Sequence, residues 1–229
     1  MCMKIKEEST DLIDLKNFLD YNEKVEEKDV TFQKLMFIYE MAIKELNTKI
    51  EIFQEEFKTF YDYDLVDHVN TRIKSPKSII NKMKKKECKL TYRDMIENIN
   101  DIAGVRVVCP LQKDIYSIKN LIQSIPGIET LKEKDYITKP KESGYSAYHI
   151  ILGVPVMLSQ QLIYVKVEVQ IRTMAMDFWS SLEHKMKYKT KEEPSKKKSK
   201  EWINCAKTIN KLDEKMMLLN EWIKYQLDW

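Results

Sequence analysis

The stretch VKVEVQIRT, Val165–Thr173, decides the fold because it alternates between two kinds of residue. Valine or isoleucine occupies positions 165, 167, 169 and 171, while Lys166, Glu168, Gln170 and Arg172 fill the positions between them. This period-two alternation predicts a strand with one buried face. The polar face carries a carboxylate, an amide and a guanidinium, which suit a metal, a base edge and a phosphate. The stretch therefore predicts both a sheet and a site on that sheet.

Apolar spacing on both sides of this strand predicts further elements. Met36, Tyr39 and Ile43 open a series that recurs every three or four residues, which indicates one long helix from Thr31 to about Phe60. Shorter helices are expected over 76–86, 91–99, 114–124 and 174–188, and strands over 105–109, 128–137, 148–156 and 162–173.

The two ends of the chain carry weaker signals. An apolar patch within residues 12–19 predicts a short N-terminal helix, and the lysine-rich stretch 189–200 predicts a polar surface connection. Apolar spacing over 201–229 predicts one long helix or two that pack back onto the body. Strands grouped in the middle of the chain, with helices before, between and after them, predict an α+β fold.

Composition sets limits on the class of protein. The 229 residues are 43% hydrophobic, enough for a core, and 39 basic against 36 acidic residues leave a net charge of only +3. The four cysteines form no C-x-x-C pair, which indicates reduced thiols and a cytoplasmic protein. No apolar run approaches the ~18 residues of a membrane span, so no membrane partner is expected.

A basic cluster, RIKSPKSIINKMKKK, begins at Arg72. Ser78, Lys82 and Lys85 follow one another at i, i+4 and i+7 and therefore share one helix face. Arg72 and Lys74 come just before the helix N-terminus, where the helix dipole also favours anions. The cluster suits a polyphosphate, although a solvated basic face would have the same composition.

Two carboxylates from separate segments are candidate metal ligands. Asp101 opens the motif DIAGVR at the mouth of a buried strand, Gly104 permits close approach, and Arg106 interrupts the apolar run. Glu168 lies on the alternating strand. One or two carboxylates together with substrate phosphates are the ligands that Mg²⁺ prefers. Asp101 alone is equally explained as a residue of a helix-to-strand turn.

The motif KESGYSAYH, which begins at Lys141, places an aromatic residue directly after a glycine. Tyr145 could stack on a base there, with His149 four residues later. A tyrosine that packs over the sheet edge is the alternative interpretation. Basic cluster, paired carboxylates and aromatic loop together favour phosphoryl transfer, in which positioning and charge neutralisation dominate.

These motifs occur in an order that resembles one known family. R-x-K-x3-S-x3-K-x2-K, DIAGVR, KESGY-x2-YH and EVQIRT, followed by FW-x3-EH, resemble the synthetase domain of RelA/SpoT-type alarmone synthetases. The chain length resembles the small members. The resemblance implies a mixed sheet related to DNA polymerase beta-type nucleotidyltransferases. It also implies a synthetase core over 71–190, with helical extensions over 1–70 and 191–229.

The resemblance further implies a reaction and a role for each matched residue. Pyrophosphate would pass from ATP to the ribose 3′-hydroxyl of GTP or GDP, giving AMP and (p)ppGpp. Small members commonly form homotetramers. Such tetramers can bind an RNA or an alarmone as a regulator, so the resemblance makes a regulator of this kind possible here. The residues matched to ATP are Arg72, Lys74, Ser78, Lys82, Lys85, Arg106 and Lys134, those matched to the guanosine acceptor are Lys141, Ser143, Tyr145, His149, Gln170, Arg172 and Asp177, and those matched to catalysis and Mg²⁺ are Asp101 and Glu168.

Three positions depart from the family pattern, and the first of them bears on the acceptor. Many small members have arginine where this chain has Ser146, so a cation expected near the acceptor phosphates is missing and GTP, GDP and GMP stay open. Asp177 stands where asparagine is common, and Lys134 stands where arginine is common. No H-D metal motif accompanies the three histidines, which predicts no alarmone hydrolysis.

Two other functions remain open on the sequence. Toxic relatives place pyrophosphate on the 3′ end of tRNA, and Lys187, Lys189, Lys191 and the run Lys196–Lys198 could meet an RNA backbone. A module that binds nucleotides without catalysis is the other alternative. The presence of both Asp101 and Glu168 speaks against that module.

Overall fold

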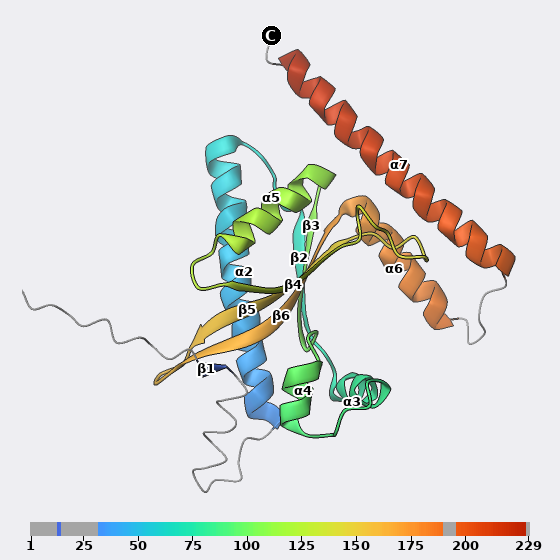
Figure 1. The fold of residues 1–229 in the computed structure, drawn as a ribbon. Helices are drawn as coiled ribbons and strands as arrows, with labels where there is room; N and C mark the ends of the chain where they lie inside the picture. The colour runs from blue at the N-terminus through green and yellow to red at the C-terminus, as the bar shows by residue number, and fades with distance from the viewer. Residues whose placement is uncertain (1–12, 15–31, 190–195, 228–229) are drawn as a thin grey trace, which may run out of the picture.

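The computed structural model describes residues 13–14, 32–189 and 196–227, and a mixed sheet lies at its centre (Figure 1). Five strands follow the order β2-β3-β6-β5-β4, and β1 pairs with one end of β6. The expected α+β class with a small mixed sheet flanked by helices is confirmed. The strands are β1 (Ile13–Asp14), β2 (His68–Ile73), β3 (Ala103–Cys109), β4 (Glu129–Asp135), β5 (Tyr148–Met157) and β6 (Leu162–Thr173), and the helices are α2 (Phe32–Tyr61), α3 (Pro76–Lys85), α4 (Tyr92–Asn98), α5 (Gln112–Gln123), α6 (Met174–Lys189) and α7 (Lys196–Leu227).

Strand direction brings distant parts of the chain into register. β3 and β6 run parallel, whereas β2 is antiparallel to β3, and β5 is antiparallel to both β6 and β4. Arg72, Gly104 and Glu168 consequently form one row across β2, β3 and β6. Residues opposite one another in a ladder share a face, so this row projects to one side of the sheet.

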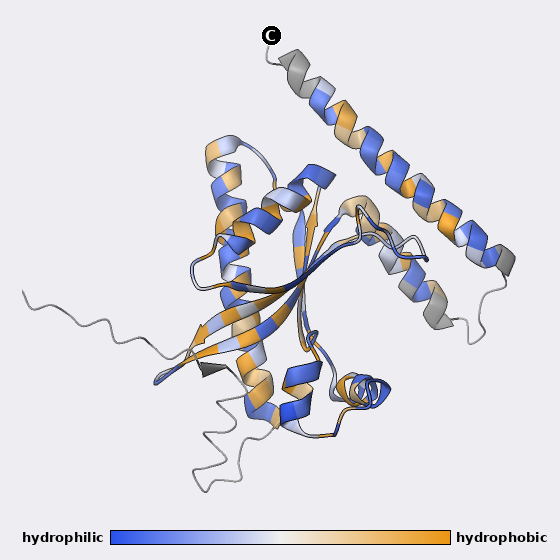
Figure 2. Cartoon of the chain, in the orientation of Figure 1, coloured by the Kyte–Doolittle hydropathy of each residue, from blue (hydrophilic) through white to orange (hydrophobic). Residues whose placement is uncertain are grey.

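The other face of the sheet forms the core. Val165, Val167, Val169 and Ile171 are fully buried, as the alternation of β6 predicts, and they belong to the cluster that α2 and α5 cover. Figure 2 shows the corresponding band of hydrophobic colour along β5 and β6. Burial of these β-branched side chains fixes the register, because a slip of one residue would place the polar face in the core.

Helix α2 confirms the long apolar stripe. Its buried side is formed by residues spaced three and four apart, among them Leu35, Tyr39, Leu46 and Ile50. The stripe was expected to reach Phe60, but that side chain is 76% exposed. Phe57 is the last residue of the stripe that still packs against the core, and residues 58–61 at the end of α2 are exposed.

The helices expected over 76–86 and 91–99 each begin at a hydroxyl N-cap residue. Ser75 is the N-cap of α3, and its hydroxyl accepts a hydrogen bond from the Ser78 amide at 3.4 Å. Thr91 caps α4 by accepting from the Asp94 amide at 3.1 Å. The Asp94 carboxylate accepts from the amide of Lys89 at 2.8 Å, so it anchors the preceding loop.

Three expectations about secondary structure are wrong. Strand β2 was not expected, although the β-branched residues Val69, Thr71 and Ile73 alternate with polar residues there, and none of its six residues is fully buried. Residues Ile13–Asp14 form strand β1 where a helix was expected, and the rest of that patch lies outside the described residues. Lys196–Lys200 belongs to α7 and is not a surface connection, while 190–195 lies outside the described residues. The C-terminal segment is one helix of 32 residues.

Within the ranges that the structure describes, no helix is long and apolar enough to cross a membrane.

Candidate functional site

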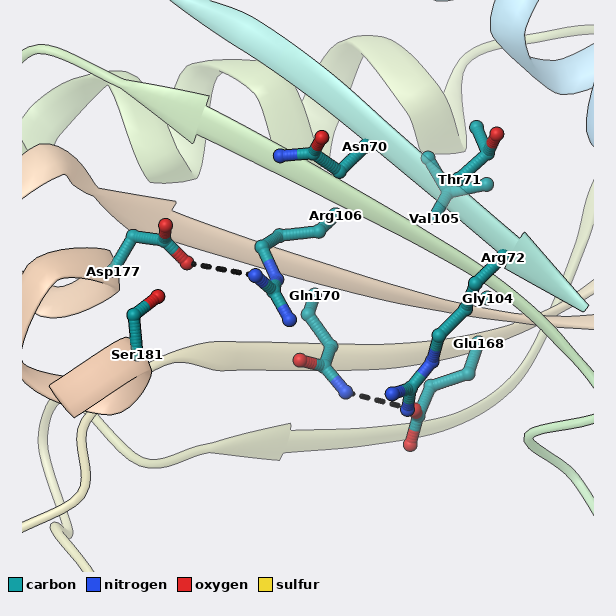
Figure 3. A pocket seen from close by; sticks show the side chains of 10 residues that line it. All are labelled: Asn70, Thr71, Arg72, Gly104, Val105, Arg106, Glu168, Gln170, Asp177 and Ser181. Atoms are coloured by element: carbon teal, nitrogen blue, oxygen red, sulfur yellow. Dashed lines mark hydrogen bonds and ion pairs between the residues drawn. The ribbon is translucent and has the colours of Figure 1, made fainter. Parts of the chain in front are cut away.

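A cavity of about 380 Å³ opens on the polar face of the sheet, between the strands and α6 (Figure 3). Its walls combine cations, carboxylates and amides, with few apolar groups. The lining residues are Asn70, Thr71, Arg72, Gly104, Val105, Arg106, Glu168, Gln170, Asp177 and Ser181.

A second row across the sheet connects this cavity with the strands beyond it. Asn70, Arg106, Gln170, His149 and Lys134 are successive partners in the ladders of β2, β3, β6, β5 and β4. Strand spacing is about 4.8 Å, so the backbones of Arg106 and Lys134 lie on the order of 14 Å apart. The structure therefore places Lys134 near His149 and away from Arg106.

A lysine–aspartate cluster, formed by Lys74, Lys82 and Asp101, lies where β2 and α3 meet the start of β3. The Asp101 Oδ2 atom accepts from the ammonium groups of Lys74 at 2.9 Å and Lys82 at 2.7 Å. Burial raises the pKa of Asp101, but the two ammonium groups outweigh it and hold the pKa below its ordinary value. The carboxylate is therefore ionised although only 8% of the residue is exposed.

The second oxygen of Asp101 is the unusual feature of this cluster. Oδ1 is buried and has no hydrogen-bond partner among the described residues. An unpartnered buried carboxylate oxygen is costly, so its presence points to a ligand. Of the other residues expected here, Ser78 accepts a hydrogen bond from the Ser75 hydroxyl at 2.9 Å, and Lys85 is exposed.

Glu168 lines the cavity beside Arg72 and Gln170 (Figure 3). Its Oε2 atom accepts from the Gln170 amide at 2.8 Å, and its Oε1 atom lies 3.7 Å from His149 Nδ1. Burial raises the pKa of Glu168. The contacts with His149 and Gln170 lower it by more than burial raises it, so the net pKa lies below the ordinary value. The Asp101 charge opposes this effect, which shows that the two carboxylates interact.

Asp177 joins two arginines from different strands. Its Oδ1 atom lies 3.2 Å from Arg106 Nη1 and 3.2 Å from Arg172 Nη1. Burial and the nearby Arg172 charge lower the pKa of Arg106, while Asp177 opposes them. This carboxylate, from the first turn of α6, thus fixes β3 and β6 side chains at one wall of the cavity.

A tyrosine cluster, formed by Tyr136, Lys141, Tyr145, His149 and Arg172, lies beside the cavity. The Tyr145 hydroxyl accepts from Arg172 Nη2 at 2.7 Å and lies 2.7 Å from His149 Nε2. The Lys141 ammonium lies 4.7 Å from the ring centroids of both Tyr136 and Tyr145. These contacts orient one aromatic ring and gather cations around it.

The structure thus brings most of the expected residues into one region. Arg72, Arg106, Glu168, Gln170 and Asp177 line the cavity itself. The lysine–aspartate cluster lies at one end and the tyrosine cluster at the other, and the Gln170–Arg172 hydrogen bond at 2.5 Å links the cavity to the tyrosine cluster. Ser143 is half-buried in the loop before Tyr145.

Four residues of this region were missed by sequence reasoning. Asn70 and Thr71 belong to the unexpected strand β2, Ser181 lies one helical turn after Asp177, and Tyr136 follows β4. The spacing i, i+4 from Asp177 could have identified Ser181. Asn70 could have been found from its place two residues before Arg72, had the strand been recognised.

Comparisons with known proteins agree with this geometry. Residues 71–193 match the family model described as a region found in RelA/SpoT proteins. GTP pyrophosphokinase YwaC of Bacillus subtilis is 41% identical over 182 residues, which cover 80% of this chain and 87% of that protein.

Solved structures extend the similarity to the fold. The crystal structure of small alarmone synthetase 1 from Bacillus subtilis bound to its product pppGpp superposes with a TM-score of 0.77 and 30% identity, covering 84% of this chain and 98% of that one. Small alarmone synthetase 2 from the same organism gives a TM-score of 0.75 and 38% identity, covering 83% and 98%. The chain belongs to the RelA/SpoT family, and among its members it is similar to the small alarmone synthetases.

Proposed function

We propose that this protein is an alarmone synthetase that transfers pyrophosphate from ATP to the ribose 3′-hydroxyl of GTP or GDP. One observation carries the proposal. Asp101, whose Oδ1 atom has no partner among the described residues, contacts Lys74 and Lys82 of the basic cluster, and its charge acts on Glu168, which contacts His149 of the tyrosine cluster. The relatives named GTP pyrophosphokinase and the neighbour bound to pppGpp support the same chemistry.

The reaction exchanges one phosphorus–oxygen bond for another. The acceptor 3′-oxygen forms a bond to the β-phosphorus of ATP, and the bond from that phosphorus to the oxygen bridging the α-phosphate breaks. AMP leaves with that oxygen, and the 3′-hydroxyl proton passes to a base or to water. Charge builds on the transferred phosphates, so nearby cations and a metal ion lower the barrier.

The basic cluster suits the ATP phosphates. Lys74 and Lys82 already converge on one point, the Asp101 carboxylate, at 2.9 and 2.7 Å. Ser78 and Lys85 follow on the same face of α3, whose N-terminus favours anions. Arg72 and Arg106 would hold the adenine from neighbouring strands, and Lys134, three strands away from Arg106, has its ammonium 5.9 Å from the Tyr136 ring centroid.

The tyrosine cluster suits the guanosine acceptor. Tyr145 offers an oriented ring for stacking on the base, and Lys141, His149 and Arg172 place positive or hydrogen-bonding groups around it. Ser143 would assist from the same loop. Gln170 and Asp177 would complete the wall of the cavity between the two nucleotides.

Asp101 and Glu168 fit a Mg²⁺ ion. Both are ionised, Asp101 comes just before β3 and Glu168 lies on the adjacent parallel strand β6, and Asp101 Oδ1 has no other partner among the described residues. The ion would take its remaining ligands from phosphates and water. The ion would supply charge neutralisation at the transferred phosphates.

The lowered pKa of Glu168 bears on its own role. A carboxylate that holds its charge firmly is a weak proton acceptor at neutral pH but a good ligand for a cation. We propose that Glu168 orients the 3′-hydroxyl and shares the ion, a role that a carboxylate with a lowered pKa suits.

Assembly into a homo-oligomer, a tetramer by family resemblance, belongs to the same proposal. Exposed apolar side chains support it: Leu212, Met216 and Leu219 are each more than half exposed along one side of α7. Such a series at i, i+4 and i+7 is typical of a helix that meets a partner.

The alternative with tRNA as acceptor receives no support, since the matched relatives are named for GTP. A binding module without catalysis would not need two ionised carboxylates in one site.

The test of the proposed function is a product assay with the purified protein, Mg²⁺, γ-labelled ATP and, separately, GTP, GDP, GMP and tRNA. Label on a guanosine nucleotide is expected, and label on tRNA alone or on no acceptor would overturn the proposal.

A further inference from the structure

Helix α7 contacts the cavity region through one of its faces. Ala206, Asn210 and Asp213 are spaced i, i+4 and i+7, so they share that face. Ala206 and Asp213 are 2% and 5% exposed. The exposed apolar residues Leu212, Met216 and Leu219 lie on a different side of α7. The face of α7 that carries Ala206, Asn210 and Asp213 therefore packs against other parts of the same chain.

The first two of these residues contact the loop that carries Tyr145. A Cβ atom added to Gly144 would lie 2.4 Å from the Ala206 Cβ, and Gly144 has a φ of +85°. Only glycine meets both requirements, so loop and helix are in direct contact. The Asn210 amide donates to the Ser146 hydroxyl at 3.2 Å, and Ser146 is 4% exposed. Helix α7 thus holds the residues on both sides of Tyr145.

The third residue contacts the end of β6 next to Arg172. The Asp213 Oδ2 atom accepts from the Thr173 hydroxyl at 2.7 Å and from the Gln112 amide at 3.3 Å. Thr173 follows Arg172, whose Nη2 donates to the Tyr145 hydroxyl at 2.7 Å. The loop of Tyr145 and the end of β6 therefore meet at the Tyr145–Arg172 hydrogen bond, and α7 contacts both of them.

From these contacts we propose that Asn210 is a positioning residue for the guanosine acceptor, acting through Ser146 on Tyr145. The inference rests on the proposed function of the tyrosine cluster. Position 146 faces α7, so its side chain serves the loop and not the acceptor phosphates. The serine at this position provides a hydrogen-bond partner for α7.

The test compares steady-state constants for the two substrates. Asn210→Ala is expected to raise KM for GDP about fivefold, the effect of one hydrogen bond. The KM for ATP and kcat should stay unchanged, because the lysine–aspartate cluster makes no contact with Asn210. Asn204→Ala is the matched control, since Asn204 is an exposed asparagine of the same helix. Ser146→Ala should match Asn210→Ala, and the double variant should be no worse than either.

Two results would overturn the inference. One is an unchanged KM for GDP in folded Asn210→Ala. The other is an equal rise in both KM values with a lowered melting temperature, which would show a purely structural role. If the wild type makes no labelled product, the proposed function fails, and calorimetric titration of the same variants with GDP decides the inference. Absent binding by the wild type, or equal binding by Asn210→Ala, would then overturn it.

Discussion

At the scale of single residues, Arg172 shows how much depends on one side chain. It is 5% exposed, and it contacts Asp177, Gln170 and the Tyr145 hydroxyl. A buried guanidinium is tolerated only with such partners. The alternation of β6 predicted that Arg172 lies on the polar face. Its partners could not be predicted, because α6 and the loop reach it only through the tertiary fold.

Glu168→Gln is the sharpest test at this scale. The exchange is nearly isosteric and keeps the Gln170 contact within reach, so the fold should persist, whereas a charge worth several kcal/mol at the reacting centre is lost. We expect synthesis to fall about a thousandfold or more. Initial rates and thermal melting of purified protein would be measured together.

The matched control is Glu129→Gln, which removes an exposed carboxylate on β4. It should retain the wild-type rate. A Glu168→Gln protein that unfolds, or one that retains full rate, would remove Glu168 from its proposed role.

At the scale of elements, the sequence was informative where one face of an element is buried. Helix α2, strands β3 and β6, and the caps at Ser75 and Thr91 follow from periodicity and local chemistry. Strand β2 carries only a weak signal of this kind, because it lies at the sheet edge and its alternating β-branched face, Val69, Thr71 and Ile73, is short and only partly buried. Its pairing with β3 is the tertiary contact that defines it, and the site residue Asn70 was missed with it.

The docking of α7 gives a prediction about pH. Burial raises the pKa of Asp213 above its ordinary value of 3.8, and Glu214 adds to this, although Thr173 and Gln112 oppose it. The protonated form suits the folded state better. Its stabilising contribution is thus complete below pH 3.8 and is lost as pH rises through the folded-state pKa.

Asp213→Asn should remove this dependence. The variant has no charge to bury, and its amide oxygen can still accept from Thr173. Denaturant unfolding at a series of pH values measures the free energy of unfolding. Relative to the wild type, that of the variant should increase as pH rises, by about 1.4 kcal/mol for each unit by which the Asp213 pKa is raised. Glu221→Gln, an exposed change on α7, should show no such trend. A constant difference between Asp213→Asn and wild type would refute the assignment.

At the scale of the whole molecule, α7 offers a surface for assembly. Figure 1 shows the helix running past α6, and Leu212, Met216, Leu219 and Trp222 are all more than half exposed. Leu219→Lys should lower the mass measured by sedimentation, because a charge would enter the buried centre of the interface. Leu131→Lys places the same change on exposed β4 and should leave the mass unchanged. A tetramer that survives Leu219→Lys would exclude this face of α7.

The parallel pairing of β3 with β6 has a consequence for how the chain acquires activity during folding. It sets Gly104 opposite Glu168, 64 positions later, and such non-local pairs form slowly because chain entropy is lost before the contacts compensate. Asp101 precedes α5 and Glu168 follows it, so neither segment carries both carboxylates. Recovery of activity after dilution from denaturant should therefore coincide with closure of the sheet, without a partly active intermediate.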